Sequence, residues 1–168
     1  MAEGDLAREG GRMAETSAEK QLVGFLAKFT PEVAAQAEAI LNRMRKRLPT
    51  ALELVYDNYN ALAIGFGPTE KSSEAIFSIA VFPRWVSLFF LQGVGLPDPE
   101  KILQGTGNVV RHVVLKRPDA LEEPAVKALM EVALERAVVP LDAKGKRRLI
   151  IKSVSPKQRA RRPAEKKR

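Results

Sequence analysis

The residues best suited to chemistry in this 168-residue chain lie in one short stretch, LQGTGNVVRH, which spans positions 103–112. Backbone N–H groups of a glycine turn can converge on an anion, and polar side chains beside the turn can add to such a site. The stretch therefore predicts a binding site for a phosphate, a carboxylate or another small ligand. Its residues are Gly105, Thr106, Gly107, Asn108 and Arg111. A turn without a ligand is the alternative, because glycine is also used wherever φ is positive.

The single histidine, His112, is the candidate acid or base of an enzyme, with Tyr56, Asp57 and Tyr59 as candidate partners. No glycine elbow around a serine, no Ser-His-Asp spacing and no Walker motif accompanies it. Arg111 and His112 are neighbours in an expected strand, so their side chains point to opposite faces and do not line one pocket. We therefore predict a protein without catalytic residues.

Metal chemistry is narrowly limited by composition. The chain has no cysteine and one histidine, which excludes disulfides, iron–sulfur clusters, zinc–thiolate sites and a multi-histidine site within one chain. Iron held by oxygen ligands needs several carboxylates close together. Glu53 and Asp57 are four residues apart on an expected helix and would share one face, so they are the metal candidates. The segment RMRKR, residues 43–47, contains four cations, which argues against an acidic iron-binding ridge on that helix. No cofactor is predicted, and bound iron is the alternative.

Positive charge is concentrated at the C-terminal end. The net charge of the chain is +8, and residues 142–168 contain twelve basic and two acidic residues, a difference of +10. From Ser155 on, the only aliphatic residue is alanine, so this basic tail is predicted to be disordered. Such a tail would bind nucleic acid weakly and without sequence preference, or would only aid solubility. The candidate nucleic-acid contacts are Lys157, Arg159, Arg161, Arg162, Lys166, Lys167 and Arg168. The apolar residues within 147–154 could instead add a short strand.

Hydrophobic periodicity predicts the elements that position these residues. A period of 3.6 predicts helices near 18–28 and over 31–47, the second capped by Thr30 and begun by Pro31. A third helix is expected from Thr50 to about residue 60, and a short one over 99–103 with Asp98 as its cap. Four runs rich in Ile, Val and Phe predict strands between 61 and 115, and Pro124 opens a last helix.

The central part of the chain resembles a known family. The segments LELVYDNYNALAIGF and VSLFFLQGVGLPDPEKILQGTGNVVRHVVL, followed by an amphipathic helix, are similar to the YdhG-like domain family over about residues 48–137. The resemblance implies a compact α+β domain, found mostly in bacterial proteins of unassigned function. Some relatives are described as frataxin-like iron chaperones. The family pattern has lysine where this chain has Asn108, which removes a second positive charge beside Arg111.

Together these observations predict an α+β fold, with N-terminal helices and a C-terminal helix packed on a small antiparallel sheet. We expect a flexible segment over 1–16, the YdhG-like domain over 17–141 and the disordered basic tail over 142–168. The start of the chain lacks the apolar stretch of a signal peptide, and no apolar run is long enough to span a membrane. A cytoplasmic location is expected.

The predicted function is that of a non-catalytic ligand-binding or interaction module, whose partner is an unidentified small ligand or protein. Two alternatives stay open. One is an iron chaperone of the frataxin-like type, and the other is non-specific association with nucleic acid through the basic tail.

Overall fold

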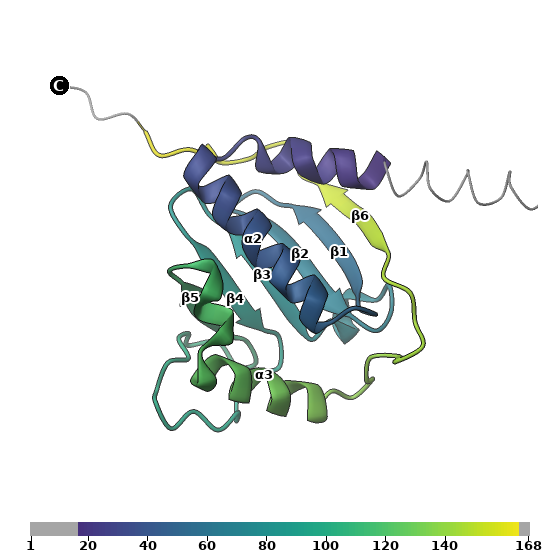
Figure 1. Cartoon of the computed structure of the whole chain (residues 1–168). Coiled ribbons are helices and arrows are strands. Elements are labelled where there is room, and N and C mark those ends of the chain that lie inside the picture. The colour runs from purple at the N-terminus through teal and green to yellow at the C-terminus, as the bar shows by residue number, and fades with distance from the viewer. Residues whose placement is uncertain (1–16, 165–168) are drawn as a thin grey trace, which may run out of the picture.

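The computed structural model describes residues 17–164 and shows helices packed on a six-stranded sheet (Figure 1). Residues 17–26 are helical. The elements that follow are α2 (Pro31–Arg47), β1 (Leu52–Asp57), β2 (Leu62–Gly67), the 3-10 helix η1 (Ser72–Glu74), β3 (Phe77–Val81), β4 (Val86–Phe90), β5 (Arg111–Leu115), the 3-10 helix η2 (Pro118–Glu122), α3 (Pro124–Glu135) and β6 (Leu149–Val154). The predicted α+β class is confirmed.

The sheet has the strand order β5-β4-β3-β2-β1-β6. Every pair of neighbours is antiparallel except β1 and β6, which run parallel. The hairpin between β3 and β4 is closed by a hydrogen bond from the Phe82 N–H to the Trp85 carbonyl, 2.9 Å. The strand β4 lies inside the sheet, between β3 and β5.

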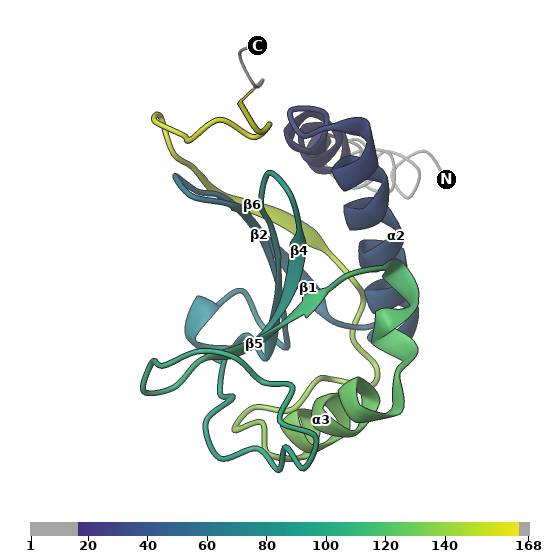
Figure 2. The ribbon, with the colours of Figure 1, turned by 90° about the vertical axis from the view of Figure 1, so that its left-hand side faces the viewer.

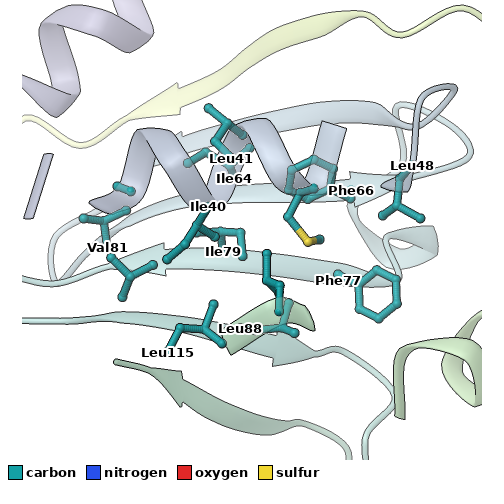
Figure 3. Packing of buried hydrophobic residues seen from close by; sticks show 14 of the residues in the cluster. Ile40, Leu41, Leu48, Ile64, Phe66, Phe77, Ile79, Val81, Leu88 and Leu115 are labelled. Atoms are coloured by element: carbon teal, nitrogen blue, oxygen red, sulfur yellow. The ribbon is translucent and has the colours of Figure 1, made fainter. Parts of the chain in front are cut away.

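The core lies between the sheet and the helices on one of its faces (Figure 2). Side chains alternate along each strand, so one residue in two points at the helices. Val55, Ile64, Ile79 and Leu88 occupy successive strands on this face and are at most 1% exposed. Figure 3 shows such side chains meeting Ile40 from α2.

The helix α2 has the bounds that the sequence predicts. The Thr30 hydroxyl accepts a hydrogen bond from the Val33 N–H at 3.3 Å, and Pro31 occupies the first helical position. The stripe with a period of 3.6 is buried against the sheet, and it consists of Val33, Ala37, Ile40, Leu41 and Met44. The predicted helices near 18–28 and from Pro124 are also present.

The predicted helix from Thr50 to about residue 60 is wrong, because residues 52–57 form the strand β1. Leu54 and Val55 point to opposite faces, and both are fully buried. The strand β1 pairs with β2, the next strand in the chain, on one side and with the sequence-distant β6 on the other, so its backbone groups are satisfied by strands outside the segment itself. An apolar run this short fits helix and strand equally well, and tertiary pairing decides between them.

The prediction of a separate, disordered tail over 142–168 is also wrong for the residues that the structure describes. The segment 149–154 is β6, and Leu149 is 6% exposed within the core. Beyond β6, Arg161 is buried. The folded unit therefore extends from 17 to at least 161 rather than to 141, and the predicted flexible segment 1–16 lies outside the described residues.

The predicted helix over 99–103 is likewise wrong, because these residues form a turn and an irregular loop. The carboxylate of Asp98 instead holds the loop in place. It accepts hydrogen bonds from the N–H groups of Ile102 and Leu103, at 3.0 and 2.9 Å. Lys101 has φ of 54°, which breaks the helical path.

Over residues 17–164, the structure contains no helix that is both long and apolar enough to cross a bilayer.

Removing β6 and the segment after it should destabilise the whole fold. A chain that ends at Arg148 would expose one edge of β1 and leave Asp57 without Arg161. Losing one partner of a buried ion pair alone costs about 3–5 kcal/mol. We expect the urea midpoint to fall sharply, or cooperative unfolding to disappear, while a chain that ends at Ala164 unfolds as the full chain does. Equal stability of both truncated chains would contradict this role of β6.

Candidate functional site

The two carboxylates predicted as metal ligands, Glu53 and Asp57, lie on the strand β1 and are fully buried. Both point to the face of the sheet that the helices cover, because they are an even number of residues from the core residue Val55. A buried carboxylate is strongly unfavourable unless it is paired and hydrogen-bonded. The surroundings of each carboxylate therefore decide what it can do.

Glu53 is held by two arginines. The Nε of Arg45 on α2 donates to both carboxylate oxygens, at 2.9 and 3.1 Å, and the Nη1 of Arg147 donates to Oε2 at 2.8 Å. Glu19 lies on the outer side of the same arginines, at 3.3 Å from each. Burial by itself would lower the pKa of Arg147, but the hydrogen bonds and negative charges of Glu53 and Glu19 raise it above its ordinary value.

Asp57 is held by the C-terminal segment. The Nη2 of Arg161 donates to Asp57 Oδ1 at 2.9 Å, and the two side chains are 3% and 1% exposed. The partly exposed Lys28 reaches the other oxygen at 3.3 Å. The backbone carbonyl of Asp57 accepts from the N–H of Ser155 and from the side-chain amide of Gln158, at 2.9 and 3.1 Å. Asp57 therefore anchors the chain beyond β6.

These contacts indicate that Glu53 and Asp57 form ion pairs inside the fold rather than bind a metal. Each carboxylate already has two cationic partners, and iron would have to displace an arginine to reach it. Within residues 17–164, no group of three or more His, Asp or Glu side chains lies close enough together to hold a metal ion. Glu53 and Asp57 are therefore two buried carboxylates, each paired with cations of the same chain.

The tail cations predicted to contact nucleic acid are partly used inside the fold. Besides the pair of Arg161 with Asp57, Arg159 lies over the ring of Tyr59, 5.5 Å from its centroid. The Nε of Arg162 donates to the Lys28 carbonyl at 3.2 Å, just after the helix over 17–26. Lys157 is exposed. The other three candidates, Lys166, Lys167 and Arg168, lie outside the described residues.

The glycine loop is closed by its own arginine. The Nη1 of Arg111 donates to the carbonyl oxygens of Gly107 and Val110, at 2.6 and 2.8 Å. Gly105 has φ of 122°, a conformation that other residues rarely adopt. Thr106 and Asn108 are exposed beside it. The five predicted residues thus lie in one loop. The guanidinium of Arg111, which was expected to bind an anion, instead donates hydrogen bonds to carbonyl oxygens of the loop.

The residues considered for acid–base chemistry do not converge. His112 lies on the edge strand β5, which three strands separate from β1, and its ring stacks on Phe89 with centroids 4.9 Å apart. Tyr56 and Asp57 are consecutive in β1 and so face opposite sides of the sheet. The Tyr56 hydroxyl is buried without a hydrogen-bond partner among residues 17–164.

A basic hollow, which the sequence analysis did not identify, lies between α2 and the start of α3. It has a volume of about 570 Å³. Its lining includes one carboxylate and four cations, and consists of Ala39, Asn42, Arg43, Lys46, Arg47, Glu122 and Lys127. Arg43, Lys46 and Arg47 are spaced i, i+3 and i+4, so they share one side of α2.

Glu122 partly neutralises the basic hollow. Its two oxygens lie 3.6 Å from Arg43 Nη1 and 2.8 Å from Arg47 Nη2. Neither Lys46 nor Lys127 forms an ion pair with any carboxylate of residues 17–164. The sequence signal for this site was the RMRKR cluster, but its relation to Lys127, about eighty positions later, depends on how α2 and α3 pack.

Comparisons of the chain with protein-family models, curated proteins and solved structures give no match. The resemblance to the YdhG-like domain family stays a prediction.

The buried pair of Asp57 and Arg161 should contribute strongly to stability. In Asp57→Ala, the guanidinium of Arg161 stays buried without its carboxylate, so the free energy of unfolding should fall by about 3–5 kcal/mol. Lys28→Ala removes the exposed partner of the same carboxylate and should cost no more than about 1 kcal/mol. Urea unfolding of both variants tests this order. Similar losses in the two variants would show that the buried pair has no special role.

Proposed function

We propose that this chain is a non-catalytic binding module and that the basic hollow receives a ligand bearing phosphate groups. The observation that supports the proposal is the excess of cations in a concave site. Four cationic side chains line the basic hollow against one carboxylate, Glu122. Hydrogen bonds between cationic side chains and phosphate oxygens are stronger than neutral ones, and a concave site lets several form on one ligand.

The position of Lys127 supports a binding role. Cations in the last turn of α2, such as Arg47, are favourable there because they face the negative end of the helix dipole. This explains part of the cluster without any ligand. Lys127, however, lies in the first turn of α3, where no acidic residue is present and a cation is unfavourable. Helix stability does not explain why a cation faces the basic hollow from that side.

Glu122 gives the basic hollow a built-in competitor. Its carboxylate contacts Arg43 and Arg47 and is 45% exposed, so it can move aside towards solvent. A phosphate would then take its place between two guanidinium groups that are already directed at one point. Arg47 is held further by a contact from its Nη1 to the sulfur of Met130, 3.0 Å. The lining is therefore arranged for an anion before the ligand arrives.

The lining of the basic hollow also supports binding rather than catalysis. Apart from Ala39 and Asn42, it consists of cations and Glu122, and that carboxylate is tied to two arginines. Nucleophilic catalysis needs an activated nucleophile next to a base. The iron-chaperone alternative has less support, since Glu53 and Asp57 are paired with arginines. Association with nucleic acid through the tail has less support because Arg161 is buried.

Binding of inorganic pyrophosphate tests the proposal. In wild type we expect saturable shifts of the amide resonances over residues 42–47 and at Lys127, with affinity that falls as salt is raised. The variant Lys46→Ala/Lys127→Ala should bind about tenfold more weakly, because two charge-assisted contacts are lost. Glu122→Gln should bind several-fold more tightly, because the internal competitor loses its charge. Isothermal titration calorimetry measures all three affinities.

The matched control is Lys20→Ala/Lys71→Ala, which removes the same charge at exposed positions outside the basic hollow. It should retain wild-type affinity. If control and hollow variants weaken binding equally, only net charge matters and the proposal is wrong. If the shifts instead map to residues 105–111, the ligand binds the glycine loop.

A further inference from the structure

A second hollow, of different chemistry, lies between β5, the loop before it and the start of α3. Its volume is about 390 Å³. About half of its lining is apolar, with Ile102 from the loop, Val113 and Val114 from β5, and Val126 from α3. Lys101 and Lys116 stand among the lining residues as well. We call this site the amphiphilic hollow, because it combines an apolar wall with cations.

The two lysines of the amphiphilic hollow are available to a ligand. Both are exposed, and neither forms an ion pair with a carboxylate of residues 17–164. The third cation there, Arg117, differs from them. Its guanidinium is already occupied by Asp119 at 2.7 Å and by Glu123 at 2.9 Å. The hollow therefore offers two ammonium groups whose charge no neighbouring side chain balances.

Lys101 carries a second, independent signal. Its φ of 54° is in the left-handed region, and no other non-glycine residue among 17–164 has a positive φ. This conformation is strained for a residue with a Cβ, and glycine would avoid the strain. The turn is held by Asp98, whose carbonyl accepts from the Lys101 N–H at 3.1 Å while its carboxylate binds the next two N–H groups. Strain of this kind is concentrated at ligand sites.

We propose that the amphiphilic hollow binds a small organic carboxylate with an apolar chain or ring. The carboxylate would lie between Lys101 and Lys116, and the apolar part would pack on Ile102 and Val114, which are only partly buried. Ligand sites of a few hundred cubic ångströms commonly combine apolar walls with a small number of placed polar groups. A multiply charged phosphate suits this site less well than the basic hollow, because much of its charge would face valine and isoleucine.

The substitution Lys101→Gly separates strain from function. Glycine adopts the observed φ freely, so the midpoint of thermal unfolding should be equal to or above that of wild type. The ligand should nevertheless bind about tenfold more weakly, because one of two ammonium groups is lost. A merely structural role of Lys101 would instead leave binding unchanged. Lys116→Ala should weaken binding to a similar degree, without any change of backbone conformation.

The experiment uses the full chain with octanoate and 1-octanol as probes, followed by amide and methyl resonances. We expect octanoate to shift residues 101–104 and 113–117 saturably and to bind at least tenfold more tightly than octanol. The variant Lys20→Ala is the control and should bind octanoate as wild type does. Octanol should bind wild type, Lys101→Gly and Lys116→Ala equally, because it makes no charged contact.

Three outcomes would overturn the proposal. They are no octanoate shifts in these residues, equal affinity of wild type for octanoate and octanol, and unchanged octanoate affinity in both lysine variants. The result is independent of the proposed function, since pyrophosphate binding is tested through Lys46 and Lys127 in the basic hollow. Either site can fail while the other is confirmed.

Discussion

The fold depends on the burial of two negative charges in its central layer. Glu53 and Asp57 project from β1 into the helix-covered core, and each is fully buried. Because an unpaired buried carboxylate is strongly unfavourable, the core is complete only when cations reach both. Arg45 supplies one from α2, and Arg147 and Arg161 supply one each from either side of β6. These three ion pairs join the C-terminal end of the chain to the helices through β1.

Because of this constraint, some of the positive charge of the C-terminal segment is used inside the fold. The chain has a net charge of +8, and residues 142–168 alone contribute +10. Inside the fold, Arg147 and Arg161 pair with the buried carboxylates, and Arg161 is itself buried. The cations free to meet a ligand are instead brought together by helix packing. Lys46 and Lys127 both line the basic hollow, so cations gather outside the basic C-terminal stretch as well.

The sequence predictions failed where an element is defined by its neighbours. The segment 50–60 was interpreted as a helix because its apolar residues fit that period, yet β1 pairs on one side with β2, the next strand, and on the other with β6, near the C-terminal end. The tail was interpreted as disordered because of its composition. Composition alone does not show that Arg161 forms a buried ion pair with Asp57. The glycine loop was located correctly. That Arg111 would turn back to its own loop carbonyls was not visible in the spacing.

The sequence by itself determined the α+β class, the bounds of α2 and the strand-forming runs of β2 to β5, because caps, prolines and hydrophobic period act locally. The absence of cysteine limited the chemistry in the same direct way. Only the tertiary structure decided that β6 joins the sheet, that Glu53 and Asp57 are buried, and that the two hollows exist. The physical reason is that pairing, burial and charge balance depend on contacts between residues that the chain order keeps far apart.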